Sequence, residues 1–282
     1  MATSAVIERL MQGAIDFHVH AAPDPFHERR LDALDLARQA READMRAVVA
    51  KNHQFGTALL ADLVNKMVPG FTLIGSLTLN REVGGLDSEI VKAAARAGAK
   101  VIWMPTISSV VNSKERPGIP LLDEEKKLLP EVIAILEVVR ENDMVLGTGH
   151  VALDEIYAVT AKARQLGAKV TITHPLHTGF GCRLTLDQQQ ELVSMGAMIE
   201  HCFVACMPAL GGMSPKVMVE HIKAVGEEHC ILSTDFGQGV HPPPPEGFRM
   251  MVGTMLDFGL SKGELETLIK TNPARILGLV TV

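Results

Sequence analysis

The chain has 282 residues, of which 47% are hydrophobic but only 4% aromatic, so its core must consist of aliphatic side chains. The formal net charge is -6 and no run of like charge stands out, which argues against a nucleic-acid or membrane-surface partner. No apolar stretch reaches the roughly 18 residues of a membrane span, and residues 1–12 lack a signal-peptide core. The four cysteines form no Cys-x-x-Cys pair, so we expect reduced thiols and a cytoplasmic protein.

A short apolar run followed by an amphipathic segment recurs along the whole chain. This pattern predicts strands at residues 14–20, 46–53, 71–79, 100–105, 144–150, 169–175, 197–201 and 230–235. It predicts helices at about residues 30–43, 57–67, 87–97, 124–142, 154–166 and 186–195. A further helix begins with a Ser214 cap and Pro215. Helical segments follow residues 242–245, one of them opened by a capping box at Ser261 and Glu264.

Eight strand–helix units in order, with no inserted domain, predict an α/β fold: one (β/α)8 TIM barrel domain over residues 1–282, with extra helices at the C-terminus. The strands are continuous apolar runs, as expected when both faces of a sheet are covered. An open doubly wound sheet is the competing architecture. The chain contains no glycine-rich phosphate loop of the dinucleotide-binding kind, and eight units favour closure of the sheet.

Polar side chains gather where the predicted strands end. In a barrel, the C-terminal strand ends and the loops after them form the active-site face. His18 and His20 lie on the same side of the first strand because side chains alternate. The other strand-end groups are Lys51, His53, His150, His174, His201 and Asp235. Imidazole nitrogen and carboxylate oxygen are ligands for zinc and similar metals, so the pattern predicts a metal site.

These residues resemble the signature of the amidohydrolase superfamily: His18-x-His20 on the first strand, His150 and His174 on the fifth and sixth, and Asp235 on the eighth. The tail at residues 271–279 is also similar to the one that closes many members. The resemblance implies one or two divalent metals that activate a water molecule for hydrolysis. Carried over by position, His18, His20 and Asp235 hold the more buried metal. His150 and His174 hold a second metal, or orient substrate if there is one metal.

One departure concerns Lys51. Binuclear members usually supply a bridging carboxylated lysine or glutamate from strand four, and strand four here offers Trp103 and Met104 instead. Lys51 on strand two has three interpretations, all of which stay open. It is a carboxylated bridge between two metals, a cation that binds an anionic substrate group, or a side chain that reaches solvent.

Asp235, Lys51 and His201 are the candidate catalytic residues, and the resemblance implies that Asp235 acts as both ligand and general base. The candidate substrate contacts are His53, His177, Arg183 and His241. Further polar residues follow strand one and strand three, where contact with substrate and contact with solvent are both open: Asp24, His27, Arg29, Arg30 and Arg81.

The sequence therefore predicts a metal-dependent hydrolase for a small amide, lactone or ester. Zinc is the expected metal, with manganese, iron and nickel as alternatives. A mononuclear decarboxylase of the same superfamily is the main alternative, because the strand-four bridge is missing. A non-catalytic metal-binding barrel is a third interpretation. The expected partners are a small-molecule substrate and further copies of the chain in a homo-oligomer.

Overall fold

The computed structural model describes residues 3–114, 116–210 and 212–279. Its strands are β1 (Ile15–His20), β2 (Ala47–Lys51), β3 (Thr72–Ile74), β4 (Ser76–Thr78), β5 (Val101–Trp103), β6 (Val145–Gly147), β7 (Lys169–Thr173), β8 (Met198–Cys202) and β9 (Cys230–Ser233). All neighbouring strands pair in parallel, in the orders β1-β2-β3 and β4-β5-β6-β7-β8-β9. Each predicted strand region overlaps at least one of these strands.

The two sheets form one barrel wall. Gly75 separates β3 from β4, and a Cβ there would collide with Ala58 at the start of the preceding helix, so only glycine fits. At the other seam, the amide of His20 donates to Phe236 O at 2.7 Å, and the amide of Asp235 donates to His18 O at 2.8 Å. These bonds join β1 to the end of β9. The predicted (β/α)8 barrel is confirmed, with β3 and β4 as its third strand.

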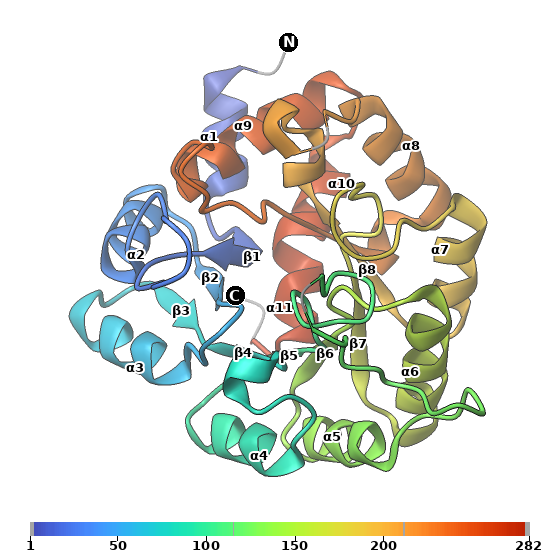
Figure 1. Ribbon diagram of the computed structural model, residues 1–282. Coiled ribbons are helices and arrows are strands. Elements are labelled where there is room, and N and C mark those ends of the chain that lie inside the picture. The colour runs from blue at the N-terminus through green and yellow to red at the C-terminus, as the bar shows by residue number, and fades with distance from the viewer. Residues whose placement is uncertain (1–2, 115, 211, 280–282) are drawn as a thin grey trace.

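The helices between residues 33 and 257 follow one another around the barrel in chain order (Figure 1). The helices of the described chain are α1 (Ser4–Met11), α2 (Ala33–Glu42), α3 (Ala58–Met67), α4 (Ser88–Arg96), α5 (Pro130–Glu141), α6 (Leu153–Leu166), α7 (Leu186–Ser194), α8 (Pro215–Val225), α9 (Pro244–Asp257), α10 (Lys262–Glu266) and α11 (Asn272–Ile276). The capping box at Ser261 and Glu264 is confirmed at the start of α10. Ser214 precedes α8, but its side chain makes no capping hydrogen bond.

Helix α5 begins later than the predicted residue 124. Asp123 accepts hydrogen bonds from the amides of Glu125 and Lys127, which holds this segment in a turn. Pro130 then occupies the first helical turn, where its missing N–H costs nothing. The first helix, α1, was not expected from the sequence and packs beside α9, where Arg249 pairs with Glu8 at 2.8 Å.

The lower half of the barrel is filled by apolar side chains. Phe17, Val49 and Trp103 belong to one buried cluster, which residues of α11 close from below. Gly147 makes room for the indole, since a Cβ there would collide with the Trp103 ring. Because this half is solid, only the C-terminal ends of the strands can hold a site.

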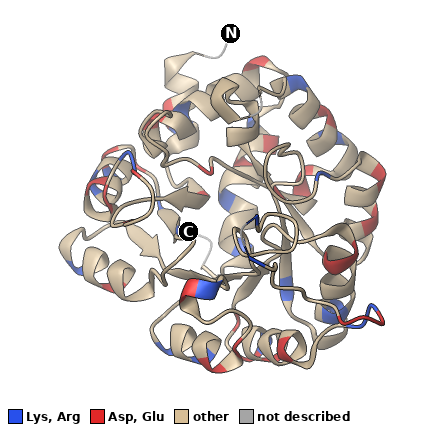
Figure 2. Ribbon diagram, viewed as in Figure 1, with Lys and Arg blue, Asp and Glu red and all other residues tan. Residues whose placement is uncertain are grey.

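The charged side chains lie mostly on the outer helices, where both signs are interspersed (Figure 2). Among the residues that the structure describes, no helix combines the length and the apolar character that crossing a membrane requires.

Candidate metal and active site

A local irregularity in β1 aims two histidines into the barrel. The β1–β2 ladder shifts register between Asp16 and Val19, so the strict alternation of faces is broken there. Phe17 therefore joins the interior apolar cluster, while the next residue, His18, also faces inward, with its ring 5.4 Å from that of Trp103. Beyond the shift, His18 and His20 share one side, and their ring centroids lie 5.4 Å apart.

His18, His20 and Asp235 converge at the upper end of the barrel core. Nε2 of His18 lies 3.3 Å from Oδ1 of Asp235, and Nε2 of His20 lies 3.1 Å from the same oxygen. All three side chains are buried. Burial acts to raise the pKa of Asp235, but the adjacent His18 and His20 hold that pKa well below its usual range. Two imidazole nitrogens and one carboxylate oxygen within 4.8 Å of one another form a donor set that fits a divalent metal.

The carboxyl group of Glu200 lies behind His18. Nδ1 of His18 donates to Oε1 of Glu200 at 2.8 Å, and both side chains are fully buried. Because a carboxylate accepts but does not donate, this bond places the proton on Nδ1 and leaves a lone pair on Nε2. Cys202 lies 3.6 Å from Glu200, and burial raises the pKa of its thiol well above the usual value. His18, Glu200 and Cys202 also place three possible ligand atoms within 4.8 Å of one another.

Lys51 comes from β2 and lies inside the same site. Its side chain is 1% exposed, which contradicts the interpretation that it reaches solvent. Nζ lies 3.1 Å from Nε2 of His18 and 4.9 Å from the centroid of the Trp103 ring. Burial lowers the pKa of Lys51, although Asp235 and Glu200 act to raise it. Trp103 occupies the end of the fourth barrel strand, where a bridging group was absent from the sequence.

His150 and His174 form a second pair, with their Nε2 atoms 2.9 Å apart. The side-chain amide of Asn112 bonds the other ring nitrogen of His150: its Nδ2 lies 2.7 Å from Nδ1 of His150. The Gly181 amide donates to Oδ1 of Asn112 at 3.2 Å, which fixes Nδ2 as the atom that faces the ring. Nδ1 of His150 therefore accepts, and its proton lies on Nε2. His150 is thus a donor, and its Nε2–H donates to Nε2 of His174, whereas His18 offers a lone pair.

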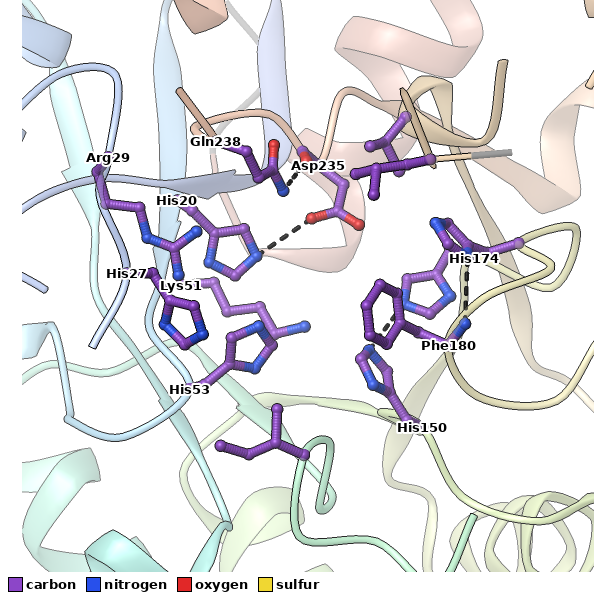
Figure 3. A pocket seen from close by; sticks show the side chains of 14 residues that line it. His20, His27, Arg29, Lys51, His53, His150, His174, Phe180, Asp235 and Gln238 are labelled. Carbon is purple, nitrogen blue, oxygen red and sulfur yellow. Dashed lines mark hydrogen bonds and ion pairs between the residues drawn. The ribbon is translucent and has the colours of Figure 1, made fainter. Parts of the chain in front are cut away.

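His20 faces His150 and His174 across a cavity of about 180 Å³ (Figure 3). Burial lowers the pKa of His20 to about 3 and those of His150 and His174 well below the usual value, so these rings stay neutral near pH 7. His174 and Asp235 have backbone φ angles of 32° and 55°. Such left-handed conformations are strained for non-glycine residues and are found at functional sites.

Two of the expected substrate contacts line this cavity. Nδ1 of His53 bonds Oγ1 of Thr106 at 2.8 Å, and the ring lies 4.9 Å from that of His20. Nδ1 of His177 accepts from the Gly179 amide at 2.9 Å, so its Nε2 carries the proton. Both side chains are therefore placed to contact a bound molecule.

The structure does not bring His201, Arg183 and His241 to the cavity. His201 faces outward from β8, because Glu200 and Cys202 on either side point inward, and burial lowers its pKa to about 3. Arg183 is exposed, since the next residue, Leu184, is the one that packs inward. His241 stacks on Phe236 at 4.7 Å and touches the cavity lining only through Gln238. These placements correct the expectation that all three face the mouth.

Sequence reasoning gave no role to several residues of the site. The sequence pattern places Glu200 within a strand and Asn112 within a polar loop, and it assigns no role to Gln238. The alternation of side chains along β8 could have revealed Glu200, because the neighbours Glu200 and His201 cannot both face the barrel interior. No sequence signal places Asn112, which reaches His150 across 38 positions of chain.

Residues 13–200 match the model of a family described as a family of unknown function, DUF6282. The chain belongs to this family. A search of curated proteins gave no significant match. DUF6282 thus names the relationship without naming a reaction.

Solved structures resemble this DUF6282 chain over nearly its whole length. The probable dipeptidase PvdM from Pseudomonas aeruginosa has a TM-score of 0.70 at 13% identity, covering 98% of each chain. A putative 2-pyrone-4,6-dicarboxylic acid hydrolase from Pseudomonas putida has a TM-score of 0.63 at 16% identity, covering 96% of this chain and 99% of that one. A 2,6-dihydroxybenzoate decarboxylase has a TM-score of 0.60 at 12% identity, covering 95% and 100%. These likenesses support the barrel fold that the resemblance to the amidohydrolase superfamily implies.

Proposed function

We propose that this protein is a metal-dependent hydrolase that acts on a small amide, lactone or ester. The observation that carries the proposal is the convergence of His18, His20 and Asp235 beside a cavity of about 180 Å³. These three residues would hold one divalent metal, and we propose zinc, because imidazole and carboxylate ligands suit it. When bound, such a metal lowers the pKa of its water to roughly 7 and polarises a carbonyl group.

The protein's own groups supply the proton transfers. Asp235 uses Oδ1 toward His18 and His20, while Oδ2 has no hydrogen-bond partner among the described residues. Because its pKa is held low, Asp235 is ionised and can accept a proton from an attacking water through Oδ2. Nε2–H of His150 lies on the facing side and donates to Nε2 of His174 at 2.9 Å; it would turn from His174 to donate to the carbonyl oxygen or the leaving group of a bound substrate.

One observation favours a second function, a metal-dependent decarboxylase. Trp103 fills the place on β5 from which binuclear hydrolases usually bridge two metals, so a single metal is the simpler arrangement. The structural neighbours include a decarboxylase as well as hydrolases. The proposal includes a cytoplasmic location, for which the support is four free cysteines.

The experiment is a turnover panel with zinc-loaded protein and with chelator-treated protein. Lactones, N-acyl amides and carboxylated phenols are offered separately. Hydrolysis that chelation abolishes and zinc restores supports the hydrolase. Release of carbon dioxide from the carboxylated phenols would contradict the hydrolase and support the decarboxylase. Tight zinc binding without any turnover points to a non-catalytic metal-binding barrel.

A further inference from the structure

Arg29 is a buried cation at the edge of the cavity. It lies in the loop after β1, which a bridge to Gln238 and a bond from the Arg30 amide to Gly237 O at 2.8 Å fasten to the loop after β9. Its side chain is 4% exposed and lines the cavity. Figure 3 shows its guanidinium group directed toward His20 and His27. The backbone around Arg29 is therefore fixed.

Asp24 orients the guanidinium group but does not satisfy it. Nε of Arg29 donates to Oδ2 of Asp24 at 2.7 Å, and Nη2 lies 2.6 Å from the same oxygen without an aligned hydrogen bond. Oδ1 of Asp24 is taken by the amides of Phe26 and His27 at 3.0 and 3.1 Å. Burial acts to raise the pKa of Asp24, but these bonds hold it below its usual value.

The edge formed by Nη1 and Nη2 thus remains without an aligned partner in the described structure. A guanidinium group has five N–H donors, and buried donors that stay unused destabilise a protein. The same Nη1–Nη2 edge matches the two oxygens of a carboxylate, which it binds through two parallel hydrogen bonds.

The surroundings of Arg29 favour an anion. Asp235 is the one carboxylate among the described residues that line the cavity. An anion at the Arg29 end of the cavity would meet no opposing negative charge except Asp24, which lies behind the guanidinium group.

We propose that Arg29 forms a carboxylate-binding subsite and that the substrate is a small carboxylate-bearing compound. The carboxylate binds the free edge of Arg29, and the rest of the molecule extends toward Asp235 and His150. The position of the reacting bond rests on the proposed function; the binding of the carboxylate does not. Arg29 thus acts in substrate selection.

The test uses metal-free protein, so that neither turnover nor metal coordination contributes. Benzoate, benzamide and phenylphosphonate are titrated calorimetrically into the wild type and into the double variant Asp24→Asn/Arg29→Gln. This variant removes both charges and leaves no unpaired buried carboxylate. Arg30→Gln is the matched control, because Arg30 carries the same charge on the same loop but is exposed. Circular dichroism checks that each variant is folded.

We expect the wild type and Arg30→Gln to bind benzoate at least about tenfold more tightly than benzamide, the effect of one charge-assisted pair of hydrogen bonds. The double variant should lose this preference. Tighter binding of phenylphosphonate than of benzoate would show that the Arg29 subsite prefers a tetrahedral anion to a carboxylate, and would overturn the proposal. Equal binding of benzoate and benzamide by the wild type would also overturn the proposal, and this comparison requires no variant. A failure of the proposed hydrolase would appear as zinc-loaded protein without turnover, with the benzoate preference intact.

Discussion

The two histidine pairs of the site, His18 with His20 and His150 with His174, look alike in the sequence. They differ in the group that bonds Nδ1 of one ring in each pair. Glu200 accepts a hydrogen bond from Nδ1–H of His18, so Nε2 of His18 carries a lone pair that can bind a metal. Asn112 donates to Nδ1 of His150, so Nε2 of His150 carries a proton. A histidine at a strand end can thus be a metal ligand or a hydrogen-bond donor. The group behind the ring decides which.

The largest effect should follow from removing a ligand on the Glu200 side. His18→Ala should lose the metal and lower kcat/KM at least about 10³-fold, since a metal contributes several kcal/mol to the transition state. Metal content by elemental analysis and turnover of the active panel compound measure both. His229→Ala, which removes an exposed histidine, is the control. Normal metal content in His18→Ala would mean that the metal lies elsewhere.

The sharpest contrast comes from His150. His150→Gln should keep one metal per chain, because His150 is a donor here, while kcat should fall about 10²-fold through loss of that donor. Metal content and steady-state kinetics are measured on the same preparation. Loss of metal in His150→Gln would make the two pairs equivalent and remove the difference between them.

A smaller effect is expected at Glu200. Glu200→Gln keeps the shape and one acceptor oxygen but removes the charge behind His18. Metal affinity should fall about 10- to 100-fold, as for other carboxylates that orient ligating histidines. Titration of zinc against a competing chelator measures this affinity. Gln238→Glu is the comparison variant, because it adds a negative charge on a side chain that does not touch His18. An unchanged affinity would show that Glu200 does not act on the metal.

The smallest effect on activity should come from His201. His201→Leu should leave metal content and kcat within about twofold, because the ring faces away from the cavity. Its folded-state pKa of about 3 lies below the ordinary 6.5, so below pH 6.5 the unfolded chain binds a proton that the folded chain does not. Acid therefore destabilises the folded wild type between pH 6.5 and pH 3, by at most about 1.4 kcal/mol per pH unit from this group.

Urea unfolding of the wild type and of His201→Leu at several pH values measures that contribution. The unfolding free energy of the variant should fall less steeply below pH 6.5. Parallel pH dependences in the two proteins would contradict the lowered pKa of His201. A large loss of turnover in His201→Leu would show that His201 acts in the site.

The sequence was sufficient for the barrel and for the inward direction of His18, His20, His150, His174 and Asp235. Apolar periodicity determines strands and helices, and strand ends of a parallel barrel must meet on one face. It was not sufficient for His201, because the face of a residue depends on register, and one position changes it. It could not reveal Asn112 either, because contacts between distant loops leave no periodic pattern.

The metal content per chain of the wild type, purified without chelators and with bicarbonate present, tests the central claim most directly. We predict one metal per chain, lost in His18→Ala and retained in His150→Gln. Two metals per chain would contradict the difference between the pairs. That result would make His150 and His174 ligands and Lys51 the carboxylated bridge.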